Sequence, residues 1–343
     1  MDHNLLEIKD LYVQYTADGR AVEAVNGITI TVKKGDTLGL VGETGAGKTT
    51  TALAIMGLVP DPPGKVTSGE ILLNGENLLQ KSAKDMRTIR GKDIAMIFQD
   101  PMTSLNPVLP VGDQIREVIL LHEKLSKAEA THKACQMLEL VGIPAERYDE
   151  YPHQFSGGMK QRVIIAIALA CNPKLLIADE PTTALDVTIQ AQVLEMMRDL
   201  KEKYGTAMIL ITHDLGVVAE VCNNVAIMYA GQIVEQSKVS DFFENPSHPY
   251  ARLLLSAVPS AHKSAQTLTG IAGSVPELSA MPSGCRFAPR CPAAKEACLQ
   301  KCPAMRPTVP GRLVRCFYPD SPVTSSTTHL QKTMRSEETV LKL

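Results

Sequence analysis

The chain has 343 residues, enough for about two domains and for a core that needs no disulfide support. Hydrophobic residues make up 44% and charged residues 21% of the sequence, which excludes wholesale disorder. The 35 basic and 37 acidic side chains leave a net charge of −2, so no overall positive field indicates a nucleic-acid partner. The strongly apolar run at 163–171 is too short to span a bilayer, and the N-terminus lacks the pattern of a signal peptide. We therefore expect a cytoplasmic protein that meets a membrane only through partners.

Strand patterns alternate with helical patterns along most of the chain. Strands are predicted at 5–13, 22–32, 37–41, 71–73, 93–98, 175–178 and 207–211. A helix is predicted at 48–57, and apolar spacing indicates mostly helix from 112 to 170, interrupted by Pro144 and Pro152. Strands that alternate with helices predict an α/β fold with a mostly parallel central sheet.

The composition changes after Ala257, where Pro, Ser and Cys become dense and periodicity is lost. This change predicts a domain boundary near Pro259, with a main domain at 1–258 and a Cys-rich extension at 259–320. The remaining segment, 321–343, begins with a Ser/Thr-rich stretch and is predicted to be a mobile tail.

A glycine-rich loop follows the predicted strand at 37–41 and matches the pattern G-x-x-x-x-G-K-[ST]. Glycines let the backbone curl so that its N–H groups face a polyphosphate, and the next helix adds the positive end of its dipole. Lys48 is expected to reach the β- and γ-phosphates and Thr49 to offer a hydroxyl to Mg²⁺. The predicted phosphate site comprises Gly42, Glu43, Thr44, Gly45, Ala46, Gly47, Lys48, Thr49 and Thr50.

Two carboxylates follow the apolar strand at 175–178, where open α/β sheets bind ligands. Asp179 is predicted to hold Mg²⁺ through water. Glu180 is predicted to orient and deprotonate the attacking water. Residues and spacing alone thus predict a Mg²⁺-dependent nucleoside triphosphatase.

The segment FSGGMKQR, which begins at Phe155, resembles the signature motif of ABC transporter ATPases, usually read as LSGGQ. Phe155 stands in place of Leu and Met159 in place of Gln, while Ser156, Gly157 and Gly158 are kept. The resemblance implies an ABC ATPase cassette: a parallel-sheet core, an N-terminal antiparallel β subdomain and a helical subdomain at about 100–170. It also implies that the amides and hydroxyl of this motif touch phosphate.

Other motifs of that family are matched in order. Gln99 resembles the glutamine that links nucleotide state to the membrane subunit and contacts Mg²⁺, and residues 184–186 resemble the D-loop. His213 resembles the switch histidine that bonds the γ-phosphate, and Tyr15 stands where the family has an aromatic residue stacked on adenine. The resemblance therefore assigns catalysis to Glu180, His213 and Gln99 and nucleotide contact to Tyr15.

The segment NPSHPY, which begins at Asn245, and the segment QDPMTSLNP, which begins at Gln99, are similar to those of ATPases that drive oligopeptide and dipeptide importers. This similarity implies ATP sandwiched in a heterodimer with a paralogous ATPase subunit, beneath two transmembrane permeases served by an extracytoplasmic peptide-binding protein. It places the chain at the cytoplasmic face of the inner membrane as a peripheral subunit. The alternatives are an importer of another cargo, such as nickel, glutathione or an oligosaccharide, or a soluble ABC protein outside transport.

Five of the eight cysteines lie between 285 and 316. In a reducing compartment such clustering favours metal ligation over disulfides. Their spacings are wider than those of most zinc sites and suit an iron–sulfur cluster. Similarity to importer ATPases with this extension predicts a four-iron, four-sulfur (4Fe-4S) cluster, with zinc or no metal as the alternatives and Cys302 as a spare thiol. The predicted ligands are Cys285, Cys291, Cys298 and Cys316.

Overall fold

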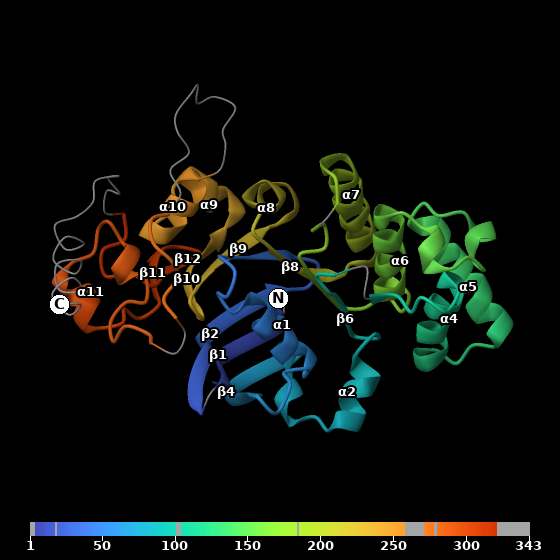
Figure 1. The fold of residues 1–343 in the computed structure, drawn as a ribbon, viewed down its shortest axis with the longest axis horizontal. Helices are drawn as coiled ribbons and strands as arrows, with labels where there is room; N and C mark the ends of the chain where they lie inside the picture. The colour runs from blue at the N-terminus through green and yellow to red at the C-terminus, as the bar shows by residue number, and fades with distance from the viewer. Residues whose placement is uncertain are drawn as a thin grey trace, which may run out of the picture.

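The computed structural model describes residues 4–17, 19–100, 104–183, 185–257, 271–277 and 280–320. The predicted boundary near Pro259 and the predicted tail at 321–343 lie outside these residues. Two sheets form the centre of the molecule, with helices on either side of the larger one (Figure 1). No helix in the described parts of the chain is long and apolar enough to cross a membrane.

The smaller sheet is antiparallel and is built from the N-terminal strands. Its order is β2-β1-β4-β5, with β1 (Asn4–Ala17), β2 (Arg20–Lys33), β4 (Gly64–Leu73) and β5 (Glu76–Asn77). In β2, Ile28, Ile30 and Val32 are buried while Thr29 and Thr31 are exposed. This alternation buries one face of the strand, as the period of two predicted. The strands predicted at 5–13 and 22–32 are confirmed, and both are longer than predicted.

The larger sheet has the order β11-β12-β10-β9-β3-β8-β7-β6. Its strands are β3 (Thr37–Val41), β6 (Ile94–Ile97), β7 (Leu175–Asp179), β8 (Ala207–Thr212), β9 (Asn224–Tyr229), β10 (Gln232–Lys238), β11 (Arg306–Val309) and β12 (Arg312–Val314). The run from β9 to β6 is parallel, and the other pairs are antiparallel. Every residue of β3, β7 and β8 is buried, as expected for parallel strands covered on both faces. The α/β fold with a mostly parallel core is confirmed.

The helices join and cover these strands. They are α1 (Lys48–Met56), α2 (Ala83–Ile89), α4 (Val111–His122), α5 (Lys127–Leu140), α6 (Gly157–Leu169), α7 (Val187–Tyr204), α8 (Leu215–Val221), α9 (Val239–Glu244), α10 (Pro249–Ser256) and α11 (Glu296–Gln300). Short 3₁₀ turns occur as η1 (Leu78–Gln80), η2 (Ala145–Arg147), η3 (Pro152–Gln154) and η4 (Ala288–Arg290). Pro144 precedes η2 and Pro152 begins η3, so both prolines interrupt the helical region as predicted.

Helices α4, α5 and α6 form one end of the molecule, on the right in Figure 1. They share a buried apolar cluster to which Ile115, Leu138 and Ile165 belong. Ser126 and Glu129 form a capping box that begins α5, which satisfies N–H groups of its first turn. The helical end is attached to the rest of the molecule through β6 and α7, which pack against α6.

The Cys-rich extension continues the larger sheet at the opposite end, coloured orange to red in Figure 1. Strand β12 pairs with β10, with Val314 opposite Glu235, and β11 pairs with β12. Phe287 is only 1% exposed and packs its ring edge-on against Tyr229 of β9. The extension therefore shares both sheet and core with the segments before 258, although its sequence has no clear periodicity.

Candidate nucleotide-binding site

The phosphate loop connects β3 to α1, in the position that the sequence predicts. The helix begins at Lys48, and no side chain caps its N-terminus at Gly47. The first N–H groups of a helix have no partner within the helix, so this end can receive an anion. Gly47 has a φ of 101°, and a Cβ there would come within 2.4 Å of the carbonyl oxygen of Ala24. Glycine is therefore required at this position for both its conformation and its lack of a side chain.

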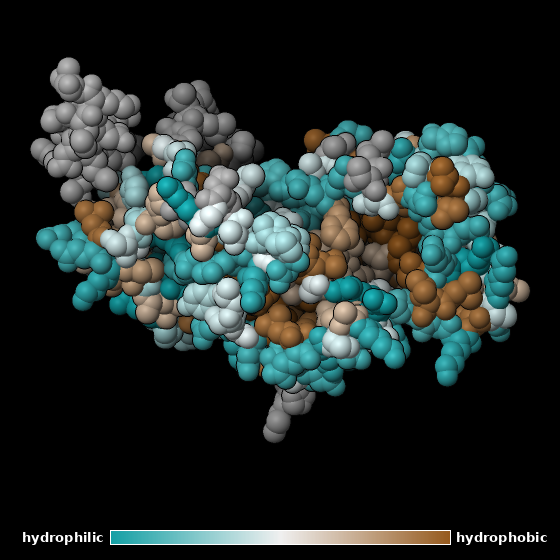
Figure 2. Space-filling view, turned by 60° about the horizontal axis from the view of Figure 1, so that its bottom comes forward, coloured by the Kyte–Doolittle hydropathy of each residue, from teal (hydrophilic) through white to brown (hydrophobic). Residues whose placement is uncertain are grey.

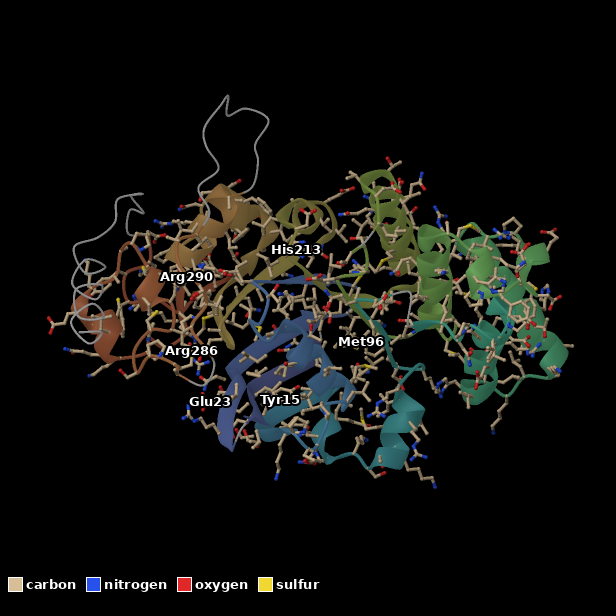
Figure 3. All side chains as sticks on the ribbon, viewed as in Figure 1. Tyr15, Glu23, Met96, His213, Arg286 and Arg290 are labelled. Atoms are coloured by element: carbon tan, nitrogen blue, oxygen red, sulfur yellow. The ribbon has the colours of Figure 1, made fainter. Side chains whose placement is uncertain are left out.

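A cavity of about 540 Å³ opens beside this loop. Its lining joins segments that are far apart in the chain: Tyr15, Val22, Ala24, Thr44, Gly45, Ala46, Gly47, Lys48, Thr49, Thr50, Gln99, Glu180 and His213. Tyr15 lies in β1 of the smaller sheet, and His213 directly follows β8 of the larger sheet, as Figure 3 shows. Most of the predicted site residues thus meet in one cavity of a size suited to a small-molecule ligand.

Glu180 is the centre of a polar cluster in this cavity. Its carboxylate accepts hydrogen bonds from Gln99 Nε2 and Thr183 Oγ1, each at 3.0 Å, and lies 3.2 Å from His213 Nδ1. Burial raises the pKa of Glu180, but the hydrogen bonds from His213 and Thr183 outweigh it and leave that pKa below its usual value. Its backbone φ is 47°, a conformation that non-glycine residues rarely adopt and that often marks a functional site.

Asp179 and Lys48 lie deeper than Glu180. Asp179 is 2% exposed, and burial raises the pKa of its carboxyl against the opposing effect of a hydrogen bond with Thr49. Burial also lowers the pKa of Lys48, although the charges of Glu180, Asp179 and Glu43 act in the opposite direction. Lys48 Nζ donates to the carbonyl oxygens of Gly42 and Glu43 at 2.6 and 3.1 Å. A buried cation held by its own loop is therefore in position for a phosphate.

Some predicted residues lie outside the cavity lining. The carbonyl of Gly42 faces Lys48, and the Glu43 side chain contacts the C-terminal extension. Ser156, Gly157 and Gly158 are also absent from the lining, because they lie at the exposed start of α6. Ser156 caps that helix by accepting a hydrogen bond from the Met159 amide.

The two departures from the usual signature motif share one neighbour. Phe155 is buried and its ring lies 4.3 Å from the Arg147 guanidinium carbon, a cation–π contact. The Met159 sulfur accepts a hydrogen bond from Arg147 at 3.4 Å. Both substitutions are thus accommodated by Arg147.

Sequence reasoning did not include Val22 and Ala24 in the site. Both belong to β2 and line the cavity because the antiparallel sheet packs next to the phosphate loop. No motif marks them, since apolar residues of a strand look alike whether they face a core or a ligand.

The predicted 4Fe-4S cluster is wrong, and so is zinc as its alternative. Within the described ranges, which include all eight cysteines, no three His, Cys, Asp or Glu side chains are grouped so that they could hold a metal ion. The predicted ligands border a cavity of only about 20 Å³, roughly the space for one water. Burial raises the pKa of Cys285 to about 11 and that of Cys291 to about 12, which favours thiols over the thiolates that bind metals. The proposed ligand set Cys285, Cys291, Cys298 and Cys316 instead borders this small cavity, and Cys285 and Cys291 pack against the apolar cluster that contains Phe287.

The fold and this cavity define an α/β nucleotide-binding protein with a phosphate loop. Comparison with known proteins narrows the class. The family model "ABC transporter" matches residues 25–183, and the model "Oligopeptide/dipeptide transporter, C-terminal region" matches residues 234–298. The chain belongs to the ABC transporter family.

Named relatives and solved structures agree with this family. The oligopeptide transport ATP-binding protein OppD of Bacillus subtilis is 52% identical, over 93% of this chain and 90% of its own length. The dipeptide transport ATP-binding protein DppD of Escherichia coli is 47% identical, over 92% of this chain and 97% of its own. A dimeric, post-hydrolysis structure of the ATP-binding cassette MJ0796, bound to ADP and Pi, superposes with a TM-score of 0.62 at 25% identity, covering 68% and 98% of the two chains.

Proposed function

We propose that this chain is the ATP-hydrolysing subunit of a membrane ABC importer that takes up oligopeptides or dipeptides. The observation that carries the proposal is the single cavity in which the phosphate loop meets Gln99, Glu180 and His213. The peptide class is supported by the relatives, which are named as peptide transport proteins and match over nearly their whole length.

The site residues divide the work of phosphoryl transfer, which needs mainly positioning and charge neutralisation. Lys48 and the N–H groups at the start of α1 bind the phosphates, and Tyr15 stacks on the adenine. Glu180 accepts the proton of the attacking water, since its lowered pKa keeps it ionised at neutral pH. His213 and Gln99 orient that carboxylate and contact the γ-phosphate side of the cavity.

Thr49 and Asp179 fit a Mg²⁺ ion, with Gln99 as a further oxygen donor. Their oxygens are hard ligands, and the Thr49 side chain already acts to lower the pKa of Asp179. Magnesium is commonly held by only one or two carboxylates together with substrate phosphates, so no larger cluster is needed. The ion would neutralise charge on the β- and γ-phosphates.

The nucleotide is sandwiched between two chains. Ser156, Gly157 and Gly158 lie at the exposed start of α6, outside this chain's own cavity, which suits them to face the nucleotide of a second subunit. The proposed second subunit is a paralogous ATPase, so the working unit is a heterodimer. ATP closes the dimer, and hydrolysis opens it.

The helical end provides a surface for two transmembrane permeases. Figure 2 shows hydrophobic side chains gathered over this end, and Val108 and Leu121 there are 74% and 72% exposed. Apolar groups of this kind mark contact sites for other proteins. Gln99 leads from the cavity toward this end, so it can pass the nucleotide state to the permeases. The assembly places the chain peripherally at the cytoplasmic face of the inner membrane, with a peptide-binding protein on the other side.

Reconstitution tests this function. The chain is purified with its paralogous ATPase and permeases and placed in proteoliposomes with the binding protein and a labelled tripeptide. We expect ATP-dependent uptake that is lost with Lys48→Ala and retained with Lys92→Ala, a lysine outside the cavity lining. Uptake of nickel, glutathione or an oligosaccharide in place of peptides would contradict the assigned cargo, and full ATP-driven transport by the Lys48→Ala assembly would contradict the site.

A further inference from the structure

A short segment of the C-terminal extension contacts the phosphate loop. We call residues 284–291 the brace. Figure 3 shows two of its arginines, Arg286 and Arg290, at the junction between the extension and the rest of the molecule. Both side chains are almost completely buried, and both form ion pairs with residues more than two hundred positions earlier in the chain.

Arg290 binds the phosphate loop itself. Its Nη1 donates to both carboxylate oxygens of Glu43, at 3.0 and 3.1 Å. Its other nitrogens donate to the carbonyl oxygens of Ile271 and Ala272, so the guanidinium is fixed on both sides. Burial lowers the pKa of Arg290, but hydrogen bonds with Tyr229 and Glu43 outweigh this effect.

Glu43 is the second residue of the loop and its carboxylate lies close to the charges of the site. The charge of Glu43 acts on the pKa of Lys48, and the Glu43 amide donates to the Tyr250 hydroxyl at 3.2 Å. An unpaired carboxylate here would repel a triphosphate and compete for Lys48. Arg290 removes this penalty because its positive charge faces the carboxylate directly.

Arg286 supports the neighbouring wall of the cavity. Its Nη2 donates to Glu23 of β2 at 2.8 Å, and its Nη1 donates to the carbonyl of Ala230. The next residue, Gly231, donates its amide to the carbonyl of Ala46 in the phosphate loop at 2.8 Å. The brace therefore contacts the cavity along two separate paths, one through a charge and one through the backbone.

From these contacts we infer that Arg290 is a positioning residue for nucleotide binding: it neutralises and orients Glu43 so that the phosphate loop accepts a triphosphate. The inference rests on the proposed ATP site and adds to it a part of the chain outside residues 1–258. It gives the extension a direct role in nucleotide affinity.

A double-mutant cycle tests this role. Binding of a non-hydrolysable ATP analogue with Mg²⁺ to the full chain is measured by calorimetry for wild type, Arg290→Gln, Glu43→Gln and the double variant. We expect Arg290→Gln to weaken binding about 3- to 30-fold, the range for one uncompensated charge near a surface. The double variant should recover most of that loss, because the repelling carboxylate is gone, and Glu43→Gln alone is measured to close the cycle.

The salt dependence separates charge from simple structural support. We expect the loss in Arg290→Gln to shrink between low and high ionic strength, since screening weakens the repulsion. Arg306→Gln, an exposed arginine of the same extension, is the matched control and should bind like wild type. A double variant that binds as weakly as Arg290→Gln at every salt concentration would overturn the inference.

Two further measurements keep the outcomes distinct. If Arg290→Gln does not fold, Arg290→Lys replaces it, and retention of the charge should hold binding within about 3-fold of wild type. A loss as large as that of Lys48→Ala would contradict the inference.

If wild type itself fails to bind the analogue, the proposed ATP site is wrong. If wild type binds, Lys48→Ala does not and Arg290→Gln matches wild type, only the role of Arg290 is wrong.

Discussion

The nucleotide cavity and the C-terminal extension are held together in different ways. Around the cavity, buried parallel strands deliver Asp179 and the phosphate loop to one edge of a sheet, and the motifs follow from that topology. In the extension, short strands and irregular segments are held by an aromatic contact of Phe287 and by the arginines of the brace. A region can therefore share the core of a domain without any periodic pattern in its sequence, provided that side chains satisfy its backbone groups.

The largest effect is expected at the centre of the cavity. Glu180→Gln should slow ATP hydrolysis by about 10²- to 10⁴-fold, the range for loss of a general base, while binding of ATP persists. Steady-state phosphate release by the assembled transporter measures the rate, and an equilibrium binding assay checks that the nucleotide still binds. Near-normal turnover would remove Glu180 from the mechanism and weaken the contrast between a catalytic cavity and a supporting extension.

A core substitution in the extension should mainly change the stability of the protein. Phe287→Ala should lower the free energy of unfolding by about 3–5 kcal/mol, because it leaves a cavity next to Tyr229 and Tyr250. Urea denaturation followed by circular dichroism measures the shift. Leu299→Ala, a partly exposed site in the same extension, is the control and should change stability by no more than about 0.5 kcal/mol. Equally small changes in the free energy of unfolding for Phe287→Ala and Leu299→Ala would mean that the extension is not part of the shared core.

Loss of the loop cation should affect binding instead of stability. Lys48→Ala should weaken ATP affinity about 10- to 100-fold, in line with the loss of charge-assisted hydrogen bonds to phosphate. The stability of the variant should be close to that of wild type, since a lysine with a pKa lowered by burial gains little from its present partners. Unchanged affinity in a calorimetric titration would show that another group binds the phosphates.

The smallest effect is a difference in thiol reactivity within the extension. Cys302 is exposed, whereas burial raises the pKa of Cys285 to about 11 and that of Cys291 to about 12. At pH 8 these two groups are thiols, and only the thiolate reacts. Iodoacetamide should therefore label Cys302 at least about tenfold faster than either, as followed by peptide mass spectrometry.

Raising the pH toward 10 should accelerate labelling of Cys285, because its thiolate fraction grows about tenfold per pH unit below its pKa of about 11. Cys302→Ser removes the fast label and serves as the control. Equally rapid labelling of Cys285 in the native protein would contradict its burial in a packed extension.

Much of the fold and of the cavity could be predicted from the sequence because local patterns carry the information. Alternation in β2, all-apolar runs such as β7 and a glycine loop before a helix each specify an element within a few residues. The order of the elements then requires that Asp179 and the phosphate loop meet at one sheet edge. The cysteines that were wrongly predicted to be metal ligands show the limit of this reasoning. Their spacing does not reveal whether buried thiols face a metal ion or pack against apolar side chains.

The sequence by itself determined the class of fold, the phosphate loop and the carboxylates that follow β7, because each depends on short-range pattern and chain order. Only the tertiary structure decided that Glu180 bonds Gln99 and His213, that β12 extends the central sheet, and that Arg290 reaches Glu43. Arg290 and Glu43 are more than two hundred positions apart in the chain, and no local pattern encodes such a pairing. Such contacts arise when packing of the whole chain buries charged groups that must then find partners.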